Sequence, residues 1–344
     1  MIADLERRLR ERAGERVRIS DYFHLFAGTS TGGLIALALT APDPADPARP
    51  RVSAAELAAF YVQDGPRIFR RTLGRKLRTL WGYAGPKYSI EPLAEAVRRR
   101  LGDVMLADAL REVVVASYDM AGREPYFFKR WRAREPVPPA DQGREERNRP
   151  IADAAMATAS APTYFPAHDL DGRALVDGGV FANNPSVAAI AEALKRTGAG
   201  RVGTDGLLVV SIGTGVHERG FDAATVSGWG KIGWILPHGA EPPILGAVLD
   251  GASDGADHWA HMLLNHDPGA PAPGRGEVGR GPRYFRLQVR LEQAIALDDA
   301  GEEALAGKLP AAAAALISER EPELEEIADR LVAAGPLAPD PHRP

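Results

Sequence analysis

Hydrophobic residues along this chain alternate between two kinds of segment. Short runs rich in aromatic or β-branched residues are typical of strands, and they lie at residues 22–27, 110–118, 126–128, 174–177 and 207–212. Hydrophobic residues at helical spacing predict helices over residues 1–13, 34–39, 90–101, 185–196 and 311–334, with another beginning near residue 53. This alternation predicts an α/β fold in which helices cover both faces of a mostly parallel sheet.

Polar and proline-rich segments indicate where these elements begin and end. Ser53 and Glu56 have the spacing of a capping box, which predicts the first turn of a helix. Four prolines within residues 41–51 predict a loop, and the charged stretch at 132–149 predicts an exposed loop.

Chain length and composition favour one domain. With 344 residues, of which 45% are hydrophobic, the chain can bury a substantial core, and no linker-like segment divides it. We therefore expect a single domain over residues 1–334, followed by a flexible, proline-rich tail at residues 335–344.

Charge balance and residue usage exclude several classes of protein. The 42 basic and 46 acidic residues leave a net charge of −4, so no overall field would recruit nucleic acid. The absence of cysteine excludes disulfides and thiolate metal sites and fits a cytoplasmic location. No apolar run approaches the roughly 18 residues that span a bilayer, and the charged first 13 residues do not resemble a signal peptide. We expect no metal and no cofactor.

One glycine-rich segment has the pattern of a nucleophile elbow. Gly28, Ser30 and Gly32 form a Gly-x-Ser-x-Gly pattern between a predicted strand and a predicted helix, where small flanking residues let the chain turn sharply and expose the serine hydroxyl. The free amides of the first helical turn carry partial positive charge, so the Thr31 amide is the natural donor to a developing oxyanion. This context predicts that Ser30 is a nucleophile.

A second match to the same pattern surrounds Ser253, at residues 251–255. The preceding residues 244–249 lack the aromatic and β-branched character of a strand and are more typical of a helix. We therefore do not expect Ser253 to act as a nucleophile.

A serine hydroxyl is a poor nucleophile until a neighbouring side chain accepts its proton. Eight histidines are present, but none lies in a segment that suggests this role. Asp177 ends a predicted strand directly before Gly178 and Gly179, which would permit the close approach of another backbone. Asp177 is therefore the candidate base.

Three segments, taken together, resemble the patatin-like phospholipase family. They are residues 26–33 around Ser30, residues 157–166 with the sequence ATASAPTYFP, and residues 177–185 with the sequence DGGVFANNP. Segments 117–119 and 211–215 also resemble the family. The resemblance extends from the first helix to about residue 264 and implies a three-layer α/β/α fold with a mostly parallel central sheet.

The resemblance implies a Ser-Asp dyad without a catalytic histidine, and its two roles match Ser30 and Asp177. It implies a lipid acyl hydrolase, a phospholipase A-type esterase, that cleaves fatty acyl esters of lipids or phospholipids through an acyl-serine intermediate. Polar residues of the same segments are expected to fix loops, and these are Asp119, Tyr164, Asn183 and Asn184.

One feature of the family is missing from this sequence. Patatin-like proteins carry a glycine-rich loop between their first strand and first helix, and its amides form most of the oxyanion hole. This sequence begins within what resembles that first helix, so we expect the domain to be incomplete at its amino terminus. An export signal would also lie in such a missing segment.

Two segments have patterns that suit peripheral contact with a membrane. Residues 67–81 combine apolar residues at helical spacing with six basic residues, as in a basic amphipathic helix. Residues 229–236 contain two tryptophans and several aliphatic residues between glycines, and indole rings favour the membrane interface. For both segments, ordinary packing against the protein is the competing interpretation and the favoured one.

Two other functions remain open at this point. An α/β-hydrolase would combine Ser30 and an acid with a downstream histidine, which could be His217, His238, His258 or His261. A catalytically impaired lipid-binding or regulatory protein would account for the missing glycine-rich loop. Replacement of each histidine distinguishes the first alternative from the dyad, and labelling of Ser30 with a fluorophosphonate distinguishes the second.

Overall fold

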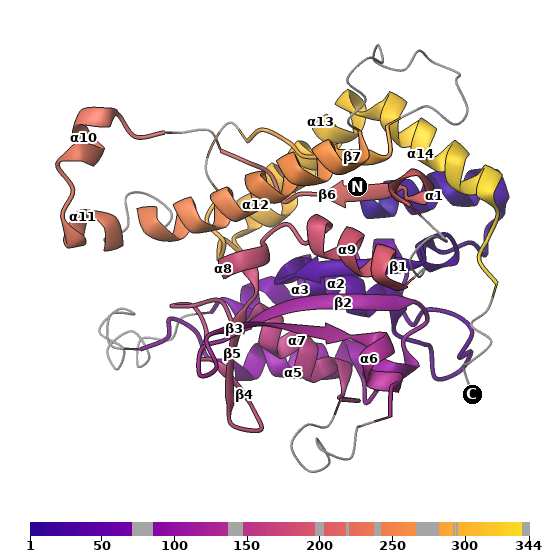
Figure 1. The fold of residues 1–344 in the computed structure, drawn as a ribbon, viewed down its shortest axis with the longest axis horizontal. Helices are drawn as coiled ribbons and strands as arrows, with labels where there is room; N and C mark the ends of the chain where they lie inside the picture. The colour runs from indigo at the N-terminus through magenta and orange to yellow at the C-terminus, as the bar shows by residue number, and fades with distance from the viewer. Residues whose placement is uncertain are drawn as a thin grey trace.

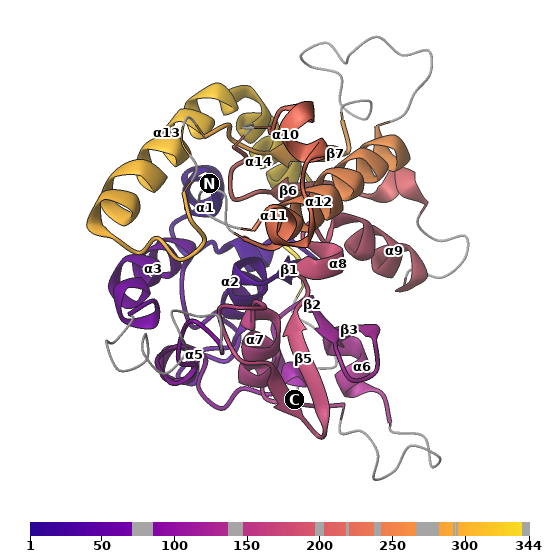
Figure 2. The same ribbon diagram turned by 90° about the vertical axis from the view of Figure 1, so that its left-hand side faces the viewer.

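In this computed structural model, the structure describes residues 1–70, 85–136, 147–196, 203–217, 220–236, 242–265, 282–291, 293 and 295–338. Helices and strands alternate along the chain, and helices cover both faces of the central sheet (Figures 1 and 2). The predicted three-layer α/β/α class is therefore confirmed.

β2 (Glu112–Asp119) is the central strand of a five-stranded sheet. β1 (Leu25–Thr29) runs parallel to the first part of β2, whereas β3 (Glu124–Lys129) and β5 (Arg173–Asp177) run antiparallel to it. β4 (His168–Leu170) pairs with β5 in the antiparallel sense. The sheet is therefore mixed, and the expectation of a mostly parallel sheet is corrected.

Tight turns account for two of the three antiparallel pairs. β4 and β5 are joined through Asp171 and Gly172, whose φ angles of 53° and 82° are those of a hairpin turn with two left-handed residues. β2 and β3 are joined through residues 120–123, too short a connection for the crossover that a parallel pair needs. β6 (Val209–Ile212) and β7 (Tyr284–Leu287) form a separate parallel pair.

Helices on one face of the larger sheet bury its main core. These helices are α2 (Thr31–Thr40), α3 (Ala54–Ile68), α5 (Glu91–Leu101) and α7 (Ile151–Ala159). Val113 and Val115 of β2 are fully buried against them, as expected for a strand covered on both faces. Ser53 caps α3 with the reciprocal Ser53–Glu56 hydrogen bonds of a capping box, so that prediction is confirmed.

α8 (Gly179–Ala182) and α9 (Ser186–Arg196) cover the opposite face of the sheet (Figure 2), and α6 (Arg130–Arg134) packs on β2 and β3 directly after β3 ends. α6 occupies the start of the stretch that the sequence predicted to be an exposed loop. Within that stretch, Ala133 is buried and the Arg134 guanidinium donates to the Ala107 carbonyl at 2.9 Å, whereas Arg132 and Glu135 are exposed as expected. Residues 137–146 of that stretch lie outside the described residues.

The two ends of the chain form a second core. α1 (Ile2–Ala13) buries Leu5 and Leu9 against the carboxy-terminal helix α14 (Glu321–Ala334). α13 (Leu309–Glu319) ends at Arg320, so the helix predicted over residues 311–334 is two helices. Short helical turns lie at Ile19–Asp21, Leu106–Asp108 and Thr204–Gly206, and Glu303–Lys308 is a π-helix.

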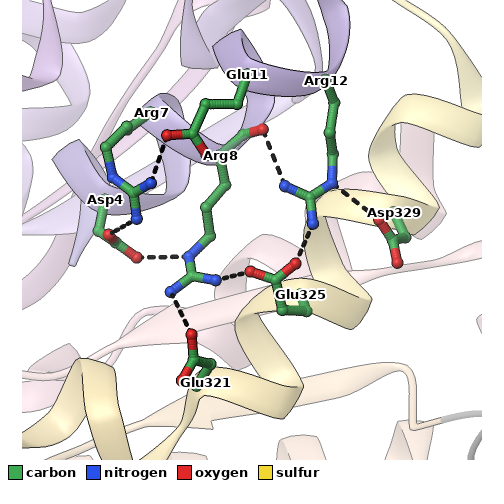
Figure 3. A network of polar contacts seen from close by, with 8 residues as sticks. All are labelled: Asp4, Arg7, Arg8, Glu11, Arg12, Glu321, Glu325 and Asp329. Atoms are coloured by element: carbon green, nitrogen blue, oxygen red, sulfur yellow. Dashed lines mark hydrogen bonds and ion pairs between the residues drawn. The ribbon is translucent and has the colours of Figure 1, made fainter.

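An ion-pair network adds to the contact between α1 and α14 (Figure 3). Arg8 is buried and pairs with Asp4 at 2.7 Å and with Glu325. Arg12 pairs with the same Glu325 and with Asp329 at 2.9 Å. The Glu325 carboxylate, shared by the buried Arg8 and by Arg12, joins the first helix to the last.

The last helices before β7 extend beyond the sheet. α10 (Ala223–Ser227), α11 (Lys231–Ile235) and the start of α12 (Pro243–Leu264) project from the body of the molecule on the left of Figure 1. α12 is long, but within the described part of the chain no helix is apolar and long enough to cross a membrane.

Two predicted segments are only partly described. Most of the predicted basic amphipathic helix at residues 67–81 lies outside the described residues, which resume at residue 85. In the predicted tail, the Leu337 amide donates a hydrogen bond to the Asp21 carbonyl at 2.7 Å, and the Arg111 guanidinium donates to the Ala338 carbonyl. Residues 337 and 338 thus contact the domain, and residues 339–344 are outside the description.

Candidate active site

Ser30 lies at the sharp turn from β1 into α2. Its backbone angles are φ 54° and ψ −127°, a combination that is rare for a residue with a side chain. Such a residue costs conformational free energy and persists only where its surroundings hold it, as at the strained turn of a nucleophile elbow. The strand itself begins at Leu25, three residues later than the sequence pattern predicted, because residues 19–21 form a helical turn.

Close packing inside the turn depends on two glycines. A Cβ on Gly28 would lie 2.1 Å from the Gly32 carbonyl oxygen, so only glycine fits at that position. A Cβ on Gly33 would lie 2.7 Å from Cγ2 of Thr158, whereas a Cβ on Gly32 would meet nothing within 4 Å. Gly28 and Gly33 are therefore the glycines required by packing, and Gly32 borders open space.

Thr158, near the end of α7, connects the turn to the central strand through two hydrogen bonds. Its hydroxyl accepts a hydrogen bond from the Ser30 amide at 2.8 Å and donates one to the Ala116 carbonyl at 2.6 Å. Thr158 is fully buried, so both bonds are made away from water. Sequence reasoning gave this residue no role, although it lies within the segment at 157–166.

The sheet brings Ser30 and Asp177 together. On β2, Thr29 of β1 pairs with Ala116, and Asp177 of β5 pairs with the next residue, Ser117. Because β3 occupies the other side of these β2 residues, β1 and β5 lie end to end on the same side. β1 runs along β2 towards Ala116, and β5 runs in the opposite direction and ends beside Ser117. The ends of the two strands therefore meet at adjacent positions of the central strand.

Asp177 is buried, with 6% of its surface exposed. Burial raises the pKa of Asp177 from its ordinary value of 3.8 to about 6, because the charged form loses hydration. A side-chain hydrogen bond with Ser30 and a 2.8 Å bond from the Gly179 amide act in the opposite direction and favour the carboxylate. The next residue, Gly178, is required by packing, since its Cβ would lie 2.5 Å from the Ala116 carbonyl.

The first turn of α2 supplies the backbone amide nearest in sequence to Ser30. The Thr31 amide is the first after Ser30, and within the described part of the chain it donates to no protein group. Tyr61 contacts the same turn through its hydroxyl, which lies 3.5 Å from the Thr31 carbonyl, and burial raises the pKa of Tyr61. The helix therefore starts with a free amide beside the serine hydroxyl.

A sequence profile of the patatin-like phospholipase family matches residues 7–190 of this chain. The chain belongs to this family. The matched residues include the elbow, Thr158 and Asp177, which are the parts of the site described above.

Plant proteins of the family are similar to this patatin-like chain. Patatin-like protein 2 of Arabidopsis thaliana is 36% identical over 282 residues, which cover 74% of this chain and 65% of that protein. Patatin-like protein 2 of Oryza sativa subsp. indica is 33% identical over 295 residues, covering 77% and 69% of the two chains. Patatin-03 of Solanum tuberosum is 31% identical over 241 residues, covering 64% of this chain and 57% of its own length.

The histidines of the alternative triad lie in other surroundings. His217 places Nδ1 3.1 Å from the Leu291 carbonyl, and His258 and His261 line a cavity of about 330 Å³ with Tyr284. Among the described residues, no hydrogen bond joins a histidine to the hydroxyl of Ser30 or the carboxyl of Asp177. His238 lies outside the described residues.

Ser253 lies in the middle of α12 rather than at a strand-to-helix turn. The prediction that residues 244–249 are helical is therefore confirmed. The Ser253 hydroxyl is buried and accepts a hydrogen bond from Arg286 at 3.3 Å, while its carbonyl accepts one from Asn184 at 3.4 Å. These contacts are structural.

Other polar residues of the patatin-like segments fix loops. Asp119 accepts hydrogen bonds from the Ala121 amide at 2.9 Å and from Arg173 at 2.9 Å. Asn183 donates to the Leu249 carbonyl at 3.1 Å, and Asn184 accepts from the Ser186 amide at 3.1 Å. In the part of the chain that the structure describes, no cluster of three His, Asp or Glu side chains could hold a metal ion.

Proposed function

We propose that this patatin-like protein is a lipid acyl hydrolase, a phospholipase A-type esterase, with Ser30 as the nucleophile and Asp177 as the base. The observation that carries the proposal is the strained Ser30 at the start of α2, bonded to a buried carboxyl group whose pKa is raised to about 6. A carboxylate with a raised pKa is a stronger base than an exposed one, and it still ionises near neutral pH.

In the first half of the proposed reaction, the Ser30 oxygen attacks the acyl carbonyl carbon while the Asp177 carboxylate takes the serine proton. The tetrahedral intermediate collapses, the alcohol oxygen leaves with the proton returned by Asp177, and the acyl group stays on Ser30. In the second half, Asp177 takes a proton from water as the water oxygen attacks the acyl-serine. The second tetrahedral intermediate then collapses, Asp177 returns the proton to the leaving Ser30 oxygen, and the fatty acid is released.

The Thr31 amide is proposed to stabilise the oxyanion of both tetrahedral intermediates. One oxyanion donor is worth on the order of 100-fold or more in rate, so this amide alone would support slow turnover.

The proposal is tested with an alkyl fluorophosphonate, which labels activated serines, and with a soluble short-chain ester. We expect both labelling and ester cleavage to be lost in Ser30→Ala and kept in Ser253→Ala, because Ser253 lies within α12. Cleavage that survives in Ser30→Ala would contradict the proposal.

The two alternatives give different results in the same assays. A Ser-His-Asp triad predicts that replacing one of His217, His238, His258 or His261 abolishes turnover, whereas the dyad predicts that none does. A catalytically impaired lipid-binding protein predicts no labelling of the folded chain. A cytoplasmic location, expected from the cysteine-free sequence, is part of our proposal.

A further inference from the structure

α12 exposes a continuous apolar stripe along its length. At 100° per residue, the exposed positions fall within about 100° of one another around the helix, and the stripe is about 28 Å long. Gly251 and Ala252 lie on the same face and add no charge. The large side chains of the stripe, each 39–60% exposed, are Ile244, Val248, Trp259, Met262 and Leu263.

The other faces of α12 have different surroundings. One face packs inward through buried residues that include Ser253, Ala260 and Leu264. A third face carries three carboxylates and two histidines, and these are Asp250, Asp254, Asp257, His258 and His261. The helix therefore separates its core-facing, polar and exposed apolar sides cleanly, as interfacial helices do.

α11 packs on α12 and extends the apolar surface. Ile232, Ile235 and Leu236 are 71%, 60% and 40% exposed, although they are large aliphatic residues. Within the described part of the chain, these three residues belong to none of the buried core clusters. Lys231 is the single charged residue of α11. In Figure 1, α11 and the start of α12 project together from the left of the molecule.

Three aromatic rings of this projecting segment pack on one another. The Trp229 ring packs edge to face on Phe221 at 4.8 Å and on Trp234 at 5.3 Å between ring centroids. These rings contact one another and leave the aliphatic side chains of α11 facing solvent. Tryptophan beside exposed aliphatic residues is the composition that favours the boundary between water and lipid.

The apolar surface is attached directly to the candidate active site. α12 packs on α8, which begins two residues after Asp177. The Asn183 side chain donates to the Leu249 carbonyl at 3.1 Å, and a Cβ on Gly179 would lie 3.0 Å from the Leu249 side chain. A lipid surface that contacted α11 and α12 would therefore lie beside the segment that carries the base.

We propose that the exposed apolar surface of α11 and α12 binds the surface of an electrically neutral lipid phase, from which the substrate reaches Ser30. We define this α11–α12 surface as Ile232, Ile235, Leu236, Ile244, Val248, Trp259, Met262 and Leu263. It deepens the proposed function and rests on it for the identity of the substrate. The three aspartates beside the stripe outnumber Lys231, so binding should not depend on anionic lipid.

The test uses the full chain carrying Ser30→Ala, which cannot consume the vesicles, in a flotation assay with phosphatidylcholine vesicles. Two double variants each replace two apolar residues of the α11–α12 surface. They are Ile232→Gln with Ile235→Gln in α11, and Trp259→Gln with Leu263→Gln in α12. We expect each to weaken the partition coefficient on the order of tenfold or more, because each removes two large apolar side chains from the lipid contact. Phosphatidylglycerol added to the vesicles should not strengthen binding.

A matched control replaces two exposed apolar residues elsewhere, Val62→Gln with Leu297→Gln, which are 49% and 54% exposed. It should leave the partition coefficient within about twofold. With Ser30 restored, all three double variants should cleave a soluble short-chain ester within about twofold of the parent, which shows that they fold.

Three outcomes would overturn the inference. The first is vesicle binding that both surface variants leave unchanged, and the second is binding that requires phosphatidylglycerol. The third is a dimer, detected by sedimentation, that both surface variants abolish, since the surface would then bind a second copy of the chain. If the parent chain cleaves no soluble ester, the proposed function fails, but the vesicle assay with Ser30→Ala still decides whether this surface binds lipid.

Discussion

The Ser30 amide donates a 2.8 Å hydrogen bond to the Thr158 hydroxyl, which in turn donates to the Ala116 carbonyl. One buried hydroxyl thus links the strained serine of the elbow to the central strand β2. Since the serine backbone adopts angles that cost free energy, the bond is one of the contacts that hold it in place. We infer that Thr158 is a positioning residue for the nucleophile.

Replacement of Thr158 by valine keeps the shape of the side chain but leaves two buried backbone groups without their partner. We expect a loss of about 1–3 kcal/mol in unfolding free energy. We also expect kcat on a soluble ester to fall by about 10- to 100-fold with little change in KM, because the serine oxygen is misplaced. Thr158→Ser, which keeps the hydroxyl, should recover most of the loss in kcat. Equal kcat in Thr158→Val and the parent would show that the bond does not position Ser30.

The three glycines of the elbow should respond differently to alanine. Gly28→Ala would place its methyl group 2.1 Å from the Gly32 carbonyl oxygen, and Gly33→Ala would place its methyl group 2.7 Å from Cγ2 of Thr158. Each should lower the unfolding free energy by about 3 kcal/mol or more. Gly32→Ala meets open space at the start of α2 and should raise stability by up to about 1 kcal/mol, since alanine favours the helix. Thermal unfolding measures the stability of all three variants. If Gly32→Ala were as unstable as Gly28→Ala, Gly32 would not border open space as the structure shows.

The pH dependence of the reaction should follow Asp177. The base must be ionised, and its pKa is raised to about 6, so kcat/KM should be constant above this pH and fall about tenfold for each unit below it. The profile is measured on an uncharged short-chain ester, which does not titrate itself. A decline centred near pH 4 would show that Asp177 is not desolvated in solution.

Asp177 should also lower the stability of the protein at neutral pH. A carboxyl group with a folded pKa of about 6 and an unfolded value of 3.8 binds its proton more tightly in the folded state, so its contribution to stability is present at low pH and lost as the pH rises through 6. Two pKa units correspond to about 3 kcal/mol. Asp177→Asn should therefore be inactive but more stable than the parent at pH 8, by up to this amount. Chemical denaturation at pH 8 and pH 4 measures the difference, which should nearly vanish at pH 4.

The contact between the first and last helices supplies a further comparison. Arg8 is 4% exposed and pairs with Asp4 and Glu325 across the α1–α14 contact, whereas the Arg7 side chain is 52% exposed. Arg8→Ala should cost about 1–3 kcal/mol of unfolding free energy because it removes the buried cation of the contact, leaving Asp4 paired only with Arg7 and Glu325 paired only with Arg12. Arg7→Ala should cost less than about 0.5 kcal/mol. Similar losses in the two variants would show that the network in Figure 3 does not stabilise the contact.

Much of the fold was predictable because it depends on short-range patterns. The valine run of β2, the capping box at Ser53 and the apolar face of α1 each reflect a local preference that a few neighbouring residues express. The elbow was predictable for the same reason, since its glycines and serine are adjacent in sequence.

Other features could not be predicted from these patterns. A run of strand-forming residues does not reveal its direction, so the hairpins β2–β3 and β4–β5 changed the expected parallel sheet into a mixed one. A charged segment was expected to be a loop, yet its first residues, 132–134, belong to α6, where Ala133 is buried. The steric need for Gly33 rather than Gly32 depends on Thr158, which is distant in sequence.

The turn at Ser30 and the strand end at Asp177 were each predictable from neighbouring residues, because a turn into a helix and the end of a strand leave local signatures. Their proximity depends on β2, where Thr29 and Asp177 pair with the adjacent residues Ala116 and Ser117. The burial that raises the pKa of Asp177 arises from the same assembly. Local sequence preferences select the elements, but the distance between two side chains and their exposure to water are set by contacts between segments far apart in the chain.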